Sequence, residues 1–228
     1  MARRPRPQFE GAEYHLFARG VRRSAIFIDD VDRAIFLGMV ADVVAKLGWK
    51  CRAYCVMTNH FHLVVTTPEP NVAHGMQWLL GRFGQWFNRR HGFEGTVFER
   101  RYRHKLIEND AYRLVVTRYV FRNPIEAGAC RRPEDWPWSS YAASIGLVER
   151  PAFLDPGWVV AQFGRGRKAL RRLRDYVTTE PVEPRPDRPR PAETAGSDPG
   201  VRAGHGRSGR DGDWVLPSAH GRLSPLRE

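Results

Sequence analysis

Alternating apolar and polar positions predict three strands in the first third of the chain. Residues 13–19 combine aromatic and aliphatic side chains with polar ones in a two-residue period, which is typical of a strand. Residues 50–57 and 60–67 have the same character and are separated by Thr58 and Asn59 alone. Such a short connection predicts a β-hairpin.

Helical spacing of apolar residues, every three to four positions, marks the other main segments. The predicted helices cover residues 31–47, 72–90, 111–122 and 165–178, with a short helix ending at Ile145. Candidate N-caps are Asp29 or Asp30, Asn71 and Asp110, and Gly48 is the candidate end of the first helix. The helix over 111–122 is expected to end before Asn123-Pro124, because the residue before proline avoids the helical region. The basic segment 97–107 is predicted to be a further strand.

The order of these elements predicts the fold class. Strand, helix, strand, strand, helix, strand indicates an α+β protein with a ferredoxin-like antiparallel sheet and helices packed on one face. Residues 1–179 are predicted to form one domain. Residues 180–228 contain 8 Pro and 7 Gly with almost no periodic apolar pattern, so they are predicted to be a disordered tail.

The net charge of the chain indicates a class of binding partner. The chain has a net charge of +12, and arginine supplies 33 of its 37 basic residues. The tail has 8 Arg and 8 acidic residues, so the excess belongs to residues 1–179. An arginine-rich domain favours nucleic acid, because guanidinium groups bind phosphate bidentately. The alternative is a general arginine bias of the source proteome. No apolar run is long enough for a membrane span, and three cysteines do not make a disulfide framework, so a cytoplasmic protein is expected.

Two pairs of residues could carry chemistry. His60 and His62 are two apart in a predicted strand and therefore project from the same face, as a metal or proton-transfer site requires. Tyr119 and Asn123 are four apart in a predicted helix and lie one turn from each other. If this helix packs on that face, two imidazoles and an amide could hold a divalent ion beside a phenol nucleophile. Taken singly, each of these residues is more often structural.

Five ordered motifs carry a resemblance to a known family. They are residues 54–65 (YCVMTNHFHLVV), 87–91 (FNRRH), 98–102 (FERRY), 118–124 (RYVFRNP) and 133–141 (PEDWPWSSY). Together they resemble the REP-associated tyrosine transposases, which are single-tyrosine members of the HUH endonuclease superfamily with an IS200-like transposase domain. The similarity runs from about residue 3 to residue 163.

The resemblance implies a function and roles for the four residues. It implies cleavage and rejoining of single-stranded DNA at short palindromic hairpins, through a covalent 5′-phosphotyrosine. Tyr119 would be the nucleophile, and His60, His62 and Asn123 the ligands of Mg²⁺ or Mn²⁺. Because imidazole is softer than Mg²⁺ prefers, Mn²⁺ is expected to work at least as well. The protein would be nucleoid-associated, as a monomer or homodimer.

The basic residues expected to bind DNA lie in two groups near the predicted site. They are Arg19, Arg22, Arg23, Arg100, Arg101, Arg103 and Lys105. The chain departs from the family pattern at Thr58, where proline is usual, at Val21, and at Glu126, where a basic residue is usual. Two alternatives remain open: a catalytically silent hairpin-binding protein on the same fold, and a metal-dependent hydrolase that uses water, with Tyr119 structural.

Overall fold

The computed structural model describes residues 8–179, so the predicted tail at 180–228 lies outside the described residues. The first six elements are β1 (Glu13–Arg19), α1 (Asp30–Leu47), β2 (Lys50–Val56), β3 (His60–Thr66), α2 (Val72–His91) and β4 (Arg103–Leu106). A 3₁₀ turn, η1 (Val21–Arg23), follows β1. After β4 come α3 (Asp110–Glu126), η2 (Pro133–Asp135), α4 (Tyr141–Ser144), α5 (Gly157–Ala161) and α6 (Gly166–Thr178). No helix of the described residues is long and apolar enough to cross a membrane.

The four strands form one antiparallel sheet in the order β2-β3-β1-β4. Strand order and connectivity are those of a ferredoxin-like fold, which confirms the predicted fold class. The predicted hairpin is also confirmed: Met57, Thr58 and Asn59 join β2 to β3, and the Met57 amide donates to the His60 carbonyl at 2.9 Å. The β1–β3 register pairs Arg19 with His60 and Phe17 with His62.

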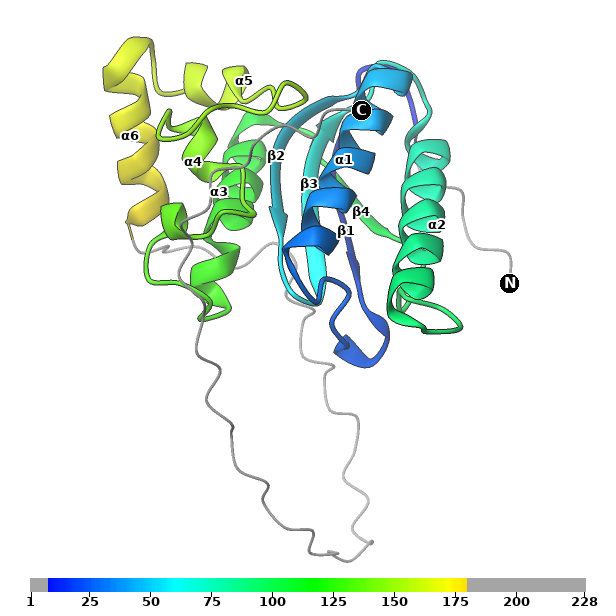
Figure 1. Cartoon of the computed structure of the whole chain (residues 1–228). Coiled ribbons are helices and arrows are strands. Elements are labelled where there is room, and N and C mark those ends of the chain that lie inside the picture. The colour runs from blue at the N-terminus through cyan, green and yellow to red at the C-terminus, as the bar shows by residue number, and fades with distance from the viewer. Residues whose placement is uncertain (1–7, 180–228) are drawn as a thin grey trace, which may run out of the picture. The chain divides into compact units, whose positions relative to one another are not determined.

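Helices cover both faces of the sheet, so the expectation of one covered face is wrong. Figure 1 shows α1 and α2 on one side and α3 to α6 on the other. Leu16, Phe61 and Leu63 pack in the core under α1 and α2, whereas Val64 and Cys55 pack in a second core with α3 and α6. The physical reason lies in β3, whose central residues are buried on both faces and therefore need cover on each.

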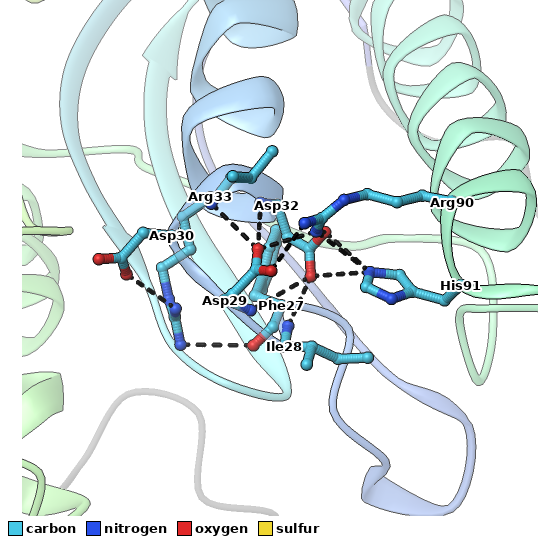
Figure 2. A network of polar contacts seen from close by, with 9 residues as sticks. Phe27, Ile28, Asp29, Asp30, Asp32, Arg33, Arg90 and His91 are labelled. Atoms are coloured by element: carbon cyan, nitrogen blue, oxygen red, sulfur yellow. Dashed lines mark hydrogen bonds and ion pairs between the residues drawn. The ribbon is translucent and has the colours of Figure 1, made fainter. Parts of the chain in front are cut away.

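A polar network joins the start of α1 to the end of α2 (Figure 2). Asp29 caps α1 in a capping box with Asp32, as one of the two predicted caps. The fully buried Asp32 carboxylate accepts from the Ile28 amide at 2.7 Å, Arg90 Nη1 at 2.5 Å and His91 Nε2 at 2.9 Å. Arg90 also reaches Asp29, at 2.7 Å. The loop between β1 and α1 is therefore held against α2.

Helix α3 differs from its prediction at both ends. Its cap is Asn109, whose Oδ1 accepts from the Tyr112 amide at 2.8 Å, and not Asp110. It also continues through Asn123 and Pro124 to Glu126. Proline is only disfavoured within a helix, and here both residues are buried between the sheet and α6, where packing offsets the lost backbone hydrogen bond.

Two further predictions fail at element ends. The strand expected over 97–107 is only β4, preceded by a single bridge between Gly20 and Phe98. Asn71 makes no capping hydrogen bond to α2, because its Oδ1 accepts from Trp49 Nε1 at 2.6 Å instead. For Asn71, a tertiary contact outweighs the local signal.

The outer edge of β2 is paired by residues that follow α3. The Val56 amide donates to the Trp138 carbonyl, and the Ser140 amide donates to the Tyr54 carbonyl, both at 2.9 Å. In return, the Tyr54 amide donates to Ser140 Oγ at 2.8 Å. Further along the edge, the Asp155 amide donates to the Cys51 carbonyl at 2.7 Å. The backbone groups of this edge are thus satisfied by the chain itself.

Helix α3 is anchored on its outer side by α6. Arg118 donates to the Thr179 carbonyl, and Arg122 Nη1 donates to the Val177 carbonyl at 2.9 Å. Leu173 and Val177 of α6 pack in the same core as Val120 of α3. The helix that carries Tyr119 and Asn123 is therefore held between the sheet and α6.

Candidate active site

The four residues singled out from the sequence lie together between β3 and α3. His60 Nε2 lies 3.0 Å from Asn123 Oδ1, and His62 Nε2 lies 3.3 Å from Asn123 Nδ2. The ring of Tyr119 stands edge-on to that of His62, with centroids 5.2 Å apart. The expected arrangement, with the Tyr119 helix against the histidine face, is therefore observed, while the catalytic roles remain predictions.

Local geometry explains why these side chains meet. In β3, Phe61 and Leu63 point into the core under α1 and α2, so His60 and His62 project from the opposite face. On α3, the four-residue spacing places Tyr119 one turn before Asn123, facing that side of the sheet. The Asn123 amide spans both imidazoles because its oxygen faces one and its nitrogen the other.

Both ring nitrogens of His60 lie close to side-chain amide oxygens. Its Nδ1 lies 2.7 Å from Asn59 Oδ1, and the Asn59 amide is oriented by a 3.0 Å hydrogen bond from its Nδ2 to the Arg23 carbonyl. Its Nε2 also faces an amide oxygen, that of Asn123. A neutral imidazole has one N–H and can donate to only one of these oxygens. A neutral His60 therefore donates from one ring nitrogen, and the other keeps a lone pair that could ligate a metal ion.

The donor set fits a hard divalent cation in part. Among residues 8–179, no three His, Cys, Asp or Glu side chains come together in a metal-binding cluster. The candidate set here has two imidazoles and depends on the Asn123 amide oxygen as its third ligand. Imidazole suits many transition metals and amide oxygen suits Mg²⁺ and Mn²⁺, so the mixed set favours Mn²⁺. Substrate oxygens and water would complete the coordination.

A third histidine, absent from the sequence-based prediction, belongs to the site. His15 of β1 is fully buried, and its Nε2 lies 2.9 Å from His62 Nδ1. The sequence did contain a signal for it. In β1 the residues that alternate with the core positions are Glu13, His15, Phe17 and Arg19, a polar face for a central strand.

Burial keeps both inner histidines neutral. Desolvation, and then the positive charge of Lys105, lower the pKa of His15 to about 3. Desolvation also lowers the pKa of His62 well below its usual range, with smaller contributions from His15, His60 and Arg19. A neutral imidazole is the form that can ligate a metal.

These shifts predict acid sensitivity of the metal-free fold. Between pH 6.5 and pH 3, His15 takes up a proton in the unfolded chain but not in the native state, so the free energy of unfolding falls as the pH is lowered. The slope assigned to His15 approaches about 1.4 kcal/mol per pH unit. Urea unfolding at pH 7.5 and 5 would measure it as the difference between wild type and His15→Phe. Equal pH dependence of the two proteins would contradict the prediction. The titratable groups close to His15, which both proteins retain, are His62, Lys105 and Tyr119.

Three of the predicted DNA-binding residues share the face of the sheet that carries the site. Strand pairing sets Arg19 opposite His60, Arg103 opposite Phe17 and Lys105 opposite His15. Side chains directly opposite each other lie on the same face. These three cations therefore surround the histidine cluster on β1 and β4.

The other four predicted DNA-binding residues lie in exposed connections. Arg22 and Arg23 form the turn after β1 and adopt left-handed backbone angles, with φ of 54° and 63°. That conformation is unfavourable for arginine and is typical of functional turns. Arg100 and Arg101 are exposed before β4, and Arg100 lies 3.6 Å from Glu99. No described contact joins Arg100 or Arg101 to the four candidate site residues.

Comparisons with known proteins agree with the geometry. Residues 8–123 match the family model described as "Transposase IS200 like". A Haemophilus influenzae protein named as a REP-associated tyrosine transposase is 28% identical over 104 residues, 41% of this chain. The chain spans 59% of the length of that relative. A solved REP-associated tyrosine transposase bound to a REP hairpin aligns with a TM-score of 0.55 and 18% identity, over 68% of this chain and 92% of that one, which shows a shared fold.

The family match covers the whole βαββαβ unit and ends at the last of the four residues between β3 and α3. It spans more than half of the chain, so the chain belongs to the IS200-like transposase family.

Proposed function

We propose that the protein is a metal-dependent single-stranded DNA endonuclease and strand transferase that acts at hairpin DNA. The observation that carries the proposal is the Asn123 amide placed between His60 and His62, with Tyr119 one helical turn away. Membership of a transposase family and the fold shared with a hairpin-bound relative support it.

In the proposed reaction the Tyr119 phenol attacks a DNA phosphodiester. Its oxygen forms a bond to phosphorus, and the bond from phosphorus to the 3′-oxygen breaks. The phenol proton leaves to solvent or a base, and the departing 3′-oxygen takes up a proton. The 5′-phosphotyrosine conserves the bond energy, so a later 3′-hydroxyl can rejoin the strand without ATP.

His60, His62 and Asn123 would hold Mg²⁺ or Mn²⁺ beside the phenol. When bound, the ion would polarise the scissile phosphate and stabilise charge in the transition state. The protein's own contribution is positional. His62 is buried and in edge contact with Tyr119, and α3 is anchored by α6, so the phenol is set beside the ligands before DNA binds.

The departure from the family pattern at Glu126 is compensated within the protein. Glu126 Oε1 lies 3.5 Å from Arg122 Nε, one turn earlier on α3, and both side chains are mostly buried. Its negative charge is therefore paired within α3.

The decisive experiment is incubation of the full chain with labelled hairpin-containing single-stranded DNA and Mn²⁺ or Mg²⁺. A covalent protein–DNA adduct on a denaturing gel, absent in EDTA, would support the proposal. Specific binding with neither adduct nor cleavage would identify a silent hairpin-binding protein. Cleavage without an adduct would identify a hydrolase that uses water.

We expect Arg19 and Arg103 to contact phosphates. Each neutralised contact should reduce the salt dependence of binding, measured as the slope of log affinity against log salt, by about 0.7–0.9. Arg19→Gln and Arg103→Gln should each show this decrease in fluorescence-anisotropy titrations over a range of salt. Lys46→Gln is the matched control, because Lys46 is exposed on α1 at the opposite face of the sheet. A slope unchanged from wild type in both arginine variants would remove these residues from the interface.

A further inference from the structure

The buried contact between His15 and His62 joins one ring nitrogen of each imidazole. His62 has two ring nitrogens with different neighbours: Nδ1 lies 2.9 Å from His15 Nε2, and Nε2 lies 3.3 Å from Asn123 Nδ2. With the Asn123 amide nitrogen facing it, His62 Nε2 presents a lone pair, which is also the form in which this nitrogen could ligate a metal ion. The proton of neutral His62 is then on Nδ1, where it can be donated to His15.

The same reasoning sets the state of His15. To accept from His62, His15 Nε2 must also present a lone pair, which places the His15 proton on Nδ1. That nitrogen is buried and has no hydrogen-bond partner among the described residues. A buried unpaired donor is costly and rare, so its presence in this position calls for an explanation.

We propose that His15 is a positioning residue that holds His62 in the Nδ1-protonated tautomer and keeps the His62 Nε2 lone pair facing the site. The inference deepens the proposed function and rests on it, since Nε2 is the nitrogen that would ligate the metal. A second imidazole, rather than a carboxylate or a backbone carbonyl, then sets the orientation of the ligand.

The packing around His15 leaves its ring little freedom to turn away. Its side chain is fully buried, and its ring centroid lies 5.0 Å from that of Phe17 and 5.1 Å from that of His62. Tyr119 closes the other side, edge-on at 6.0 Å. His15 is therefore also in contact with the proposed nucleophile, so a test must separate hydrogen bonding from packing.

Two substitutions make that separation. His15→Phe keeps an aromatic ring of similar size but removes the acceptor. His15→Gln can return an amide oxygen near the position of Nε2, so it should rescue the hydrogen bond. His104→Phe is the matched control, because His104 lies on β4 in contact with Tyr14, whose side chain belongs to the opposite face of the sheet.

The first measurement is the ¹⁵N ring chemical shifts of His62 in the metal-free protein, which distinguish the two tautomers directly. We expect the Nδ1-protonated form in wild type, His15→Gln and His104→Phe, and a mixture or the other tautomer in His15→Phe. An unchanged His62 tautomer in His15→Phe would overturn the proposal. This readout needs neither metal nor DNA, so its failure is distinct from failure of the proposed function.

The second measurement is Mn²⁺ affinity by calorimetry on the same four proteins. Loss of a hydrogen-bond partner of a metal ligand weakens binding by about 10–100-fold, which is the decrease expected for His15→Phe. His15→Gln should stay close to wild type, and far-UV circular dichroism verifies that each variant is folded. Equal losses in His15→Phe and His15→Gln would show that His15 acts by packing alone and would overturn the inference.

Discussion

Replacing Tyr119 by phenylalanine is expected to abolish the covalent adduct with DNA and to reduce strand cleavage by about 10⁴-fold or more. The substitution removes only the phenol oxygen, which is the atom that would bond to phosphorus. Phenylalanine keeps the aromatic ring that stands edge-on to His62 and His15. The measurement is adduct and product yield on a denaturing gel with hairpin DNA and Mn²⁺.

Two comparisons make the Tyr119 result decisive. Hairpin binding by Tyr119→Phe should match wild type, because the proposed phosphate contacts lie on β1 and β4. Tyr112→Phe, at the start of the same helix, should retain full activity. Undiminished cleavage by Tyr119→Phe would show that water is the nucleophile and that the tyrosine is structural, while the metal site could still stand.

Replacing Asp32 by alanine is expected to lower the free energy of unfolding by about 3 kcal/mol. Asp32 is fully buried, and its carboxylate accepts from Arg90, His91 and the Ile28 amide (Figure 2). Alanine would leave these donors without the acceptor around which they are arranged. Arg90 keeps its contact with Asp29, which limits the loss. Urea unfolding at pH 7.5 measures the change.

Asp42→Ala is the matched control for Asp32, because Asp42 is an exposed aspartate on the same helix. Its free energy of unfolding should stay within about 0.5 kcal/mol of wild type. If both variants lost the same amount, the effect would come from helix charge and not from the buried network.

The pairs His60–His62 and Tyr119–Asn123 could be predicted from the sequence, because each depends only on a short spacing along the chain. Residues two apart on a strand share a face, and residues four apart on a helix lie one turn from each other. Both relations are local and hold wherever the strand or helix forms. That the two elements face each other did not follow from local spacing alone, and the structure shows it through the contacts of Asn123.

Several failures of prediction come from tertiary contacts. Helix α3 passes through Pro124 because both faces of the helix are packed, and Asn71 is drawn from its cap by Trp49. The alternation in β1 marked His15, but its contact with His62 was missed because the two residues are 47 positions apart in the sequence. The basic residues on β4 were placed near the site from charge density, and the register explains why Arg103 and Lys105 reach it.

The paired edge of β2 bears on how this fold avoids aggregation. A bare edge strand recruits strands from other molecules, and here the segment containing Trp138 and Ser140 occupies that edge. The opposite edge, β4, is short and carries Arg103 and Lys105, whose charges repel a second copy. Since the covering segment follows residue 123, a fragment limited to the family-matched residues would expose β2 as a template for intermolecular sheets. A fragment that stays monodisperse is therefore expected to be longer than the family-matched residues 8–123, although these include all four candidate site residues.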